Sequence, residues 1–184
     1  MSPRAKLLVL AALFAMPIVA SVIAYNVIEP NATGNFGELL LPPARVTSQP
    51  LQTQAGGGFS FGDLSGRWVM VVSDSGECPA ACRDKLVTMQ QVRLALGRNA
   101  SRVERVFVVD DLRPPDAAAL GAFSGLRVAL TPAGLSLPPG AGNDRAHIYL
   151  VDPRGNVMLR WPAGADRKRM LGDLQRLLKA SQIG

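Results

Sequence analysis

The two cysteines of this chain, Cys78 and Cys82, lie four positions apart in the stretch SDSGECPAACRDKL, residues 73–86. Thiolates attack disulfides and bind soft metal ions, so a close pair can exchange disulfides or hold an ion such as Cu(I). On a helix this spacing puts both side chains on one face, with Cα atoms about 6 Å apart, which is within reach of a disulfide. The residues alone leave three alternatives: a redox pair, part of a metal site, or two inert thiols in the core.

The elements that must position these cysteines are a buried strand and a helix. The apolar run of residues 68–73 predicts a strand covered on both faces, and from Arg83 onward apolar residues recur at helical spacing. Pro79 suits the first position of a helix. We therefore expect the cysteines at the opening turn of that helix, where the macrodipole favours a thiolate and a partner from outside can reach the sulfurs.

The rest of the chain continues the pattern of strands and helices. Residues 102–110 predict a second buried strand, 116–123 a helical stretch, and 147–162 a hairpin that turns at 152–155. Residues 166–180 predict a final helix with a buried leucine-rich face. The order strand, helix, strand, helix, hairpin, helix predicts a single α/β domain with a thioredoxin-like fold.

The N-terminus predicts a transmembrane signal anchor over residues 7–28. This window carries no charge, follows Arg4 and Lys6, and is long enough to cross a bilayer core, which needs about 20 apolar residues. The positive-inside rule then keeps residues 1–6 in the cytoplasm and exports the rest. A cleaved signal peptide is the alternative. In a bacterium the anchor would lie in the inner membrane, with the C-terminal domain in the oxidising periplasm.

Between the anchor and the domain, residues 29–58 are rich in proline and end in a run of three glycines, which predicts a tether with one short strand at 45–47. The thioredoxin-like domain is expected over residues 59–184. The formal net charge is +6, but the arginines are scattered rather than gathered with aromatic partners, which argues against nucleic-acid binding.

Three motifs of this chain resemble the Sco family (SenC/PrrC-like). They are LSGRWVMVVS at residues 64–73, CPAAC at 78–82 and HIYLVDPRG at 147–155, and the resemblance covers roughly residues 45–180 and the anchor. Sco proteins are membrane-anchored, thioredoxin-like proteins that assist the assembly of cytochrome c oxidase. They bind copper or reduce thiols of the copper-binding subunit of the oxidase. The resemblance therefore implies that subunit, or another thiol protein, as the partner.

The resemblance also implies site residues. Cys78 and Cys82 match the cysteine motif of the family, and residues 149–155 match its strand and turn. The family places a histidine ligand five residues before the tyrosine of that strand, where this chain has Asp144. The single histidine, His147, lies two residues before Tyr149. The implied copper ligands are thus Cys78 and Cys82, with His147 as a shifted third ligand.

Two functions from different classes follow. In the first, the chain is an assembly factor that acts as a thiol–disulfide oxidoreductase, handles Cu(I), or does both. Cys78 attacks a partner disulfide and Cys82 resolves the mixed disulfide. In the second, the chain is a non-catalytic binding or structural component of a membrane complex, with a degenerate site. Its cysteines then form a static disulfide that stabilises the start of the helix.

Overall fold

The computed structural model describes residues 2–27, 34–46, 51–54, 56–131 and 144–181. Two compact units, Met1–Gly34 and Asn35–Gly184, are described separately. The first unit is formed by helix α1 (Pro3–Val27), which contains Pro17. Its stretch Pro3–Ala24 is long and apolar enough to cross a membrane, and in the described part of the chain it is the one such helix. This helix covers the span predicted at 7–28, except for residue 28, which lies outside the described residues.

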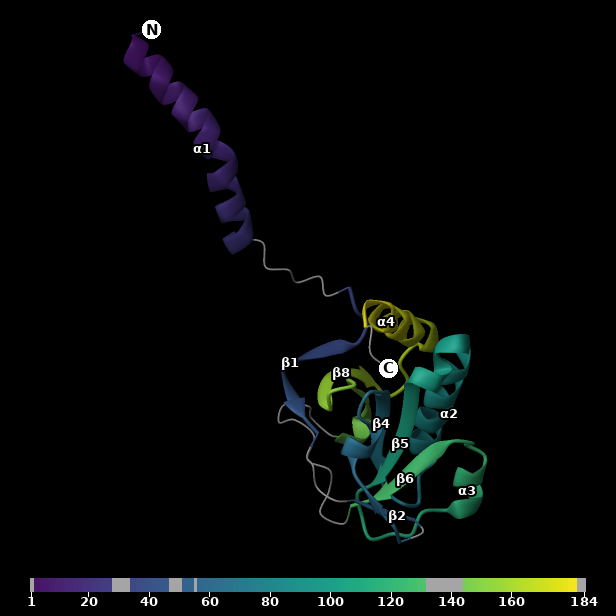
Figure 1. Cartoon of the computed structure of the whole chain (residues 1–184). Coiled ribbons are helices and arrows are strands. Elements are labelled where there is room, and N and C mark those ends of the chain that lie inside the picture. Colours follow the sequence, from purple (N-terminus) through teal and green to yellow (C-terminus); the bar gives the residue numbers. More distant parts are fainter. Residues whose placement is uncertain (1, 28–33, 47–50, 55, 132–143, 182–184) are drawn as a thin grey trace. The chain divides into compact units, whose positions relative to one another are not determined.

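The second unit is built on a mixed sheet whose strands follow the order β1-β8-β7-β4-β5-β6-β2-β3 (Figure 1). Strand β5 pairs in parallel with both of its neighbours, β4 and β6. Strand β4 pairs with its other neighbour, β7, in the antiparallel sense. The parallel β4–β5 pair follows from the long crossover that carries helix α2. The strands are β1 (Glu38–Arg45), β2 (Leu51–Thr53), β3 (Gly58–Phe59), β4 (Trp68–Asp74), β5 (Val103–Val109), β6 (Leu126–Leu130), β7 (His147–Val151) and β8 (Asn156–Pro162).

The helices α2 (Ala80–Ala95), α3 (Ala117–Gly121) and α4 (Arg167–Ala180) all pack in one apolar cluster with the sheet. Because side chains alternate along a strand, Met70 and Val72 of β4 face this cluster. Val69 and Val71 face a second cluster on the opposite side of the sheet, which includes Phe61 of the 3₁₀ helix Phe61–Leu64. Strand β4 is therefore buried on both faces, as its continuous apolar sequence predicted.

The hairpin predicted at residues 147–162 is confirmed as β7 and β8. Its turn is stabilised by Asp152, whose carboxylate accepts hydrogen bonds from the amides of Arg154 and Asn156 at 2.9 and 2.8 Å. Gly155 adopts a positive φ of 84°, which a residue without Cβ tolerates. The final helix is confirmed as α4, capped by Asp166 through the amide of Arg169 at 2.9 Å.

The N-terminal boundary of the folded unit differs from the prediction. Residues 29–58 were expected to form a tether with one short strand at 45–47, but β1 spans residues 38–45 and pairs with β8, while β2 and β3 extend the opposite edge. Strand β6 was not predicted either. The sequence of residues 131–142, which is rich in proline and glycine, predicts a loop, and all of it except residue 131 lies outside the described residues.

Candidate functional site

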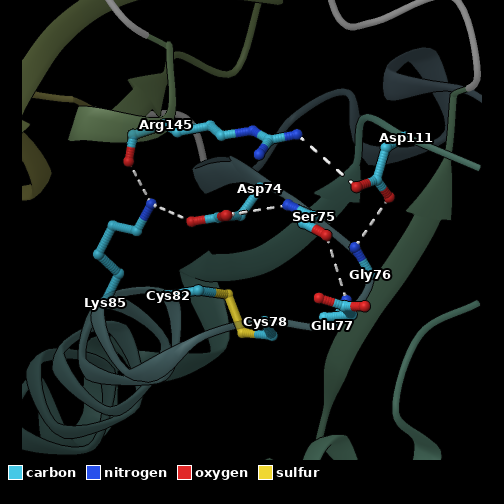
Figure 2. Close-up of a disulfide and its surroundings, with 9 residues drawn as sticks. All are labelled: Asp74, Ser75, Gly76, Glu77, Cys78, Cys82, Lys85, Asp111 and Arg145. Carbon is cyan, nitrogen blue, oxygen red and sulfur yellow. Dashed lines mark hydrogen bonds and ion pairs between the residues drawn. A yellow bond between two sulfur atoms is a disulfide. The ribbon is translucent and has the colours of Figure 1, made fainter. Parts of the chain in front are cut away.

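Cys78 and Cys82 lie at the junction between β4 and α2, at the carboxyl end of the central strand (Figure 2). Strand β4 ends at Asp74, and α2 begins at Ala80. The two cysteines form a disulfide, with their Cα atoms 5.1 Å apart. The junction and the proximity predicted from their spacing are therefore present, and the pair is in its oxidised form.

The opening of α2 differs in detail from the expected one. Pro79 is the N-cap rather than the first helical residue, and no side chain caps this end. Cys78 precedes the cap, so Cys82 is the cysteine within the first turn. Cys78 has a φ of 40°, which is rare for a residue with a Cβ, and its amide donates to the carbonyl of Ser75 at 2.9 Å. The bond closes a tight turn that aims Cys78 back toward Cys82.

Both cysteines are fully buried, with 0% of their surface exposed, and belong to the apolar cluster beneath the helices. The expectation that a partner could reach the sulfurs directly is therefore wrong for this oxidised form. The three residues between the cysteines, Pro79, Ala80 and Ala81, are nevertheless all exposed. The disulfide is therefore adjacent in sequence to a short exposed segment. The side chains of both cysteines pack instead with apolar residues of β4 and α2 in the core.

A buried ion pair lies beside the disulfide. Lys85, one turn after Cys82 on α2, donates to Asp74 at 2.8 Å, and the two side chains are 2% and 8% exposed. Lys85 also donates to the carbonyl of Arg145, which lies in the 3₁₀ turn Asp144–Ala146. The other carboxylate oxygen of Asp74 accepts from the amide of Ser75 at 2.9 Å (Figure 2). This pair joins α2 to the end of β4 and to the turn before β7.

A second polar contact fixes the residues just before Cys78. Asp111 follows β5 and accepts a hydrogen bond from the amide of Gly76 at 3.0 Å. Partial burial alone would raise the pKa of Asp111, but hydrogen bonds from Ser75, Gly76 and Arg113 and the charge of Arg145 outweigh it, so the pKa is lowered. The carboxylate is thus the form that holds the segment before Cys78 in place.

Glu77 and Arg113 form an exposed ion pair over the same junction. The amide of Asp116 donates to the carbonyl of Gly76 at 3.3 Å. The connection between β5 and α3 therefore lies directly against the segment that leads into the disulfide.

His147 is not brought to the sulfurs. Its ring lies 5.9 Å from the ring of Tyr149, which belongs to the cluster on the face of the sheet opposite the disulfide. His147 also lies close enough to Glu38 of β1 to help lower the pKa of that carboxyl, whose main partner is Arg160. Across the described residues no group of three His, Cys, Asp or Glu side chains could hold a metal ion. Asp144, at the position of the family's histidine, begins the turn that precedes β7.

Sequence reasoning missed the roles of Lys85 and Asp111. A signal for Lys85 was present, because the buried stripe of α2 runs through Cys82, Leu86 and Met89, and a lysine on that side needs a buried partner. Asp111 gave no comparable signal, since its contact with Gly76 joins residues 35 positions apart. Reduction of the disulfide would give two thiols, one on the residue before the N-cap and one in the first turn of α2.

Comparison with known proteins places this geometry in context. The profile of a family described as "Transmembrane-like, thioredoxin-like, C-terminal domain" matches residues 68–181. A search of curated proteins gave no match.

Among solved structures, yeast Sco1 with copper bound is similar, with a TM-score of 0.64 and 17% identity over 76% of this chain and 95% of that one. Bradyrhizobium japonicum ScoI with copper bound has a TM-score of 0.57 and 21% identity over 72% and 99%. BsSco, described with a disulfide switch and as a member of the Sco family of cytochrome c oxidase assembly proteins, has a TM-score of 0.54 and 14% identity over 75% and 96%. These similarities confirm the predicted fold, and the profile match shows that this chain belongs to the transmembrane-like, thioredoxin-like C-terminal domain family.

Proposed function

We propose that this protein is a membrane-anchored, Sco-like thiol–disulfide exchange protein that assists cytochrome c oxidase assembly. The observation that carries the proposal is the Cys78–Cys82 disulfide at the strand-to-helix junction of a thioredoxin-like fold. A pair at this position can pass between dithiol and disulfide with little change in the sheet below it. Its enzymatic class would be thiol–disulfide oxidoreductase.

The reaction starts from the reduced protein. The Cys78 thiolate attacks one sulfur of a partner disulfide, and the other partner sulfur leaves as a thiolate. The Cys82 thiolate then attacks Cys78 Sγ in the mixed disulfide, which releases the second partner thiolate. Two electrons pass to the partner, and the Cys78–Cys82 disulfide is formed. A dithiol protein that donates two electrons would restore the reduced form.

Access to the buried sulfurs requires the segment Glu77–Ala81 to move. Three features favour such local opening: the first turn of α2 has no side-chain cap, Cys78 holds a left-handed φ, and the residues between the cysteines are exposed. A residue with a Cβ in the left-handed region costs about 1–2 kcal/mol, which is relieved when the turn opens. The unpaired amides of the first helical turn would then stabilise a thiolate.

The partner and the compartment follow from the Sco resemblance and from α1. The copper-binding subunit of cytochrome c oxidase is the first candidate partner, and another thiol protein of the same membrane is the second. In this proposal α1 spans the bacterial inner membrane once, with Arg4 and Lys6 in the cytoplasm and the folded unit in the periplasm. An oxidising compartment suits a chain whose cysteines are paired.

Copper handling is a further part of the proposal, with Cu(I) as cargo. Yeast Sco1 and Bradyrhizobium ScoI are described as copper-bound. Here the donors that fit Cu(I) are the two sulfurs, which become available only after reduction. His147 lies on the other face of the sheet, so a third ligand would come from a partner or from another group of this chain.

A second candidate function is a non-catalytic component of a membrane complex whose disulfide is static. The full burial of both cysteines is the observation that favours it. In that case the disulfide would stabilise the uncapped start of α2, and its loss would lower thermal stability without loss of any exchange reaction.

Trapping separates the two candidates. In membranes from the native organism, a Cys82→Ser variant should accumulate a mixed disulfide between Cys78 and its partner, which mass spectrometry can identify. The matched Cys78→Ser variant should trap much less, and the double variant nothing. Oxidase activity should fall in all three. The static alternative predicts no mixed disulfide and normal oxidase, with only a lower Tm.

A further inference from the structure

The chain enters the folded unit at a fixed point on helix α4. The amides of Phe36 and Gly37 donate to the two carboxylate oxygens of Asp173 at 2.9 and 2.8 Å. Asp173 is completely buried and also accepts from Trp161 Nε1 at 3.0 Å. A Cβ at position 37 would overlap the side chains of Leu159 and Trp161, so glycine fits this approach without a shift of either one. The start of the domain is thereby held against α4.

A basic turn lies at this same point. We use this name for Arg167, Lys168 and Arg169, three exposed residues in the first turn of α4. The guanidinium of Arg169 lies 3.9 Å above the ring of Phe36. Within the described residues none of these three side chains forms an ion pair. Arg167 does donate hydrogen bonds to Thr88 and Gln91 of α2. The turn therefore presents three positive charges beside the entry of the chain.

The covalent chain limits how far this turn can lie from the membrane anchor. Nine residues lead from Val27, the last residue of α1, to Phe36. A fully extended chain of that length spans at most about 32 Å. A domain of this size has a radius of gyration of about 15 Å. Rotation of the domain could carry other faces well away from the anchor, but the basic turn always stays within the reach of the linker.

We propose that the basic turn binds anionic lipid headgroups of the bilayer that α1 crosses. Lys and Arg near a bilayer surface are attracted by anionic lipids, and the attraction is lost beyond about 8 Å at physiological salt. In the described part of the chain the charges of the turn have no acidic partner. They lie beside the point where the linker joins the folded unit, which allows them to reach phosphate groups of the same bilayer. The contact would hold α4 toward the membrane and restrict rotation of the domain. The inference does not depend on the chemistry of the cysteines.

The acetylation rate of Lys168 tests this proposal in the full-length protein. The protein is reconstituted in nanodiscs of neutral phosphatidylcholine or of phosphatidylcholine with roughly 30% phosphatidylglycerol. Lysines are acetylated briefly and quantified by mass spectrometry. The negative potential of an anionic leaflet keeps a nearby ammonium protonated, so Lys168 should react about threefold more slowly in the anionic nanodiscs. At 0.5 M NaCl, where the Debye length is about 4 Å, the difference should disappear.

Charge-matched variants complete the test. The R167Q/R169Q variant keeps Lys168 but should lose its protection in anionic nanodiscs. The R127Q/R154Q variant removes two positive charges as well, one from β6 and one from the hairpin turn. In this variant Lys168 should remain protected in anionic nanodiscs. Equal Lys168 rates in the two lipids for the native protein would overturn the proposal, as would protection that persists in R167Q/R169Q. Protection by soluble polyglutamate but not by phosphatidylglycerol would assign the turn to an acidic protein and also overturn it.

Discussion

The backbone of Gly76 packs directly against the carbonyl group of Arg113, with no room for a side chain at position 76. The amide of Gly76 also donates to Asp111, and its carbonyl accepts from the amide of Asp116. The residues that lead into the disulfide are thus locked onto the connection between β5 and α3. Whatever loosens this contact should make the Cys78–Cys82 disulfide easier to reach.

Replacing Gly76 with alanine tests the contact by sterics alone. The new Cβ would overlap the Arg113 carbonyl, so we expect the free energy of unfolding to fall by about 1–3 kcal/mol and reduction of the disulfide by a phosphine to become faster. Gly121→Ala is the control, because nothing lies within 4 Å of its Cβ position in α3. Denaturant unfolding followed by fluorescence of the buried Trp68 and Trp161 measures both variants. Equal stability of the two would contradict the described packing.

Asp111→Asn tests the same contact through charge. The pKa of Asp111 is lowered in the folded protein from an ordinary value of 3.8, so its contribution is complete above that value and is lost as the pH falls through the folded pKa. At pH 7 the variant should be reduced by phosphine up to about tenfold faster than the native protein. As the pH falls through the lowered pKa of Asp111, the two rates should converge, because the native carboxyl becomes protonated. The Asp84→Asn variant, at an exposed position, serves as control. If the ratio of the reduction rates of Asp111→Asn and the native protein did not change with pH, this role of Asp111 would be contradicted.

Lys85→Met tests the ion pair beneath the junction. The substitution leaves the Asp74 carboxylate buried and without its charge partner, which we expect to cost about 3–5 kcal/mol of folding free energy. The double variant D74N/K85M should recover much of that loss. Lys179→Met, on the exposed side of α4, should stay within about 0.5 kcal/mol of the native protein. A K85M variant as stable as K179M would show that the pair contributes nothing.

Local patterns in the sequence were enough to predict the framework of the site. The uninterrupted apolar run of β4 predicted a strand buried on both faces, and Pro79 with the helical spacing after it located the start of α2 to within one residue. The turn at Asp152–Gly155 was equally local. These signals depend on neighbours in the chain, so no tertiary information was needed.

What the sequence did not predict depends on long-range contacts. Strand β1 contains Pro42 and Pro43 and resembles a linker, yet its pairing with β8 holds it at the edge of the sheet, where proline is tolerated. The burial of the sulfurs depends on how the helices pack over β4. The orientation of His147 depends on its register in β7, which turns its ring toward Tyr149 and away from the disulfide.

His147→Ala tests whether this histidine takes part in copper handling. Since its ring lies on the opposite face of the sheet, we expect the reduced protein to bind Cu(I) in chelator competition with an affinity unchanged by the substitution. Cys82→Ser, which removes one of the two sulfurs, should weaken the same binding by at least about tenfold. A comparable loss in H147A would mean that the reduced form rearranges and brings the imidazole to the sulfurs.

The most direct test of the central claim is a redox titration of the full-length protein in its native state. The protein is equilibrated with dithiol/disulfide buffers, rapidly alkylated and analysed by mass spectrometry, while tryptophan fluorescence reports on folding. We predict a reversible two-electron transition at a potential above about −300 mV, the upper bound typical of structural disulfides, with the fold intact. A Cys78–Cys82 disulfide that resists reduction until the domain unfolds would contradict the proposed exchange function.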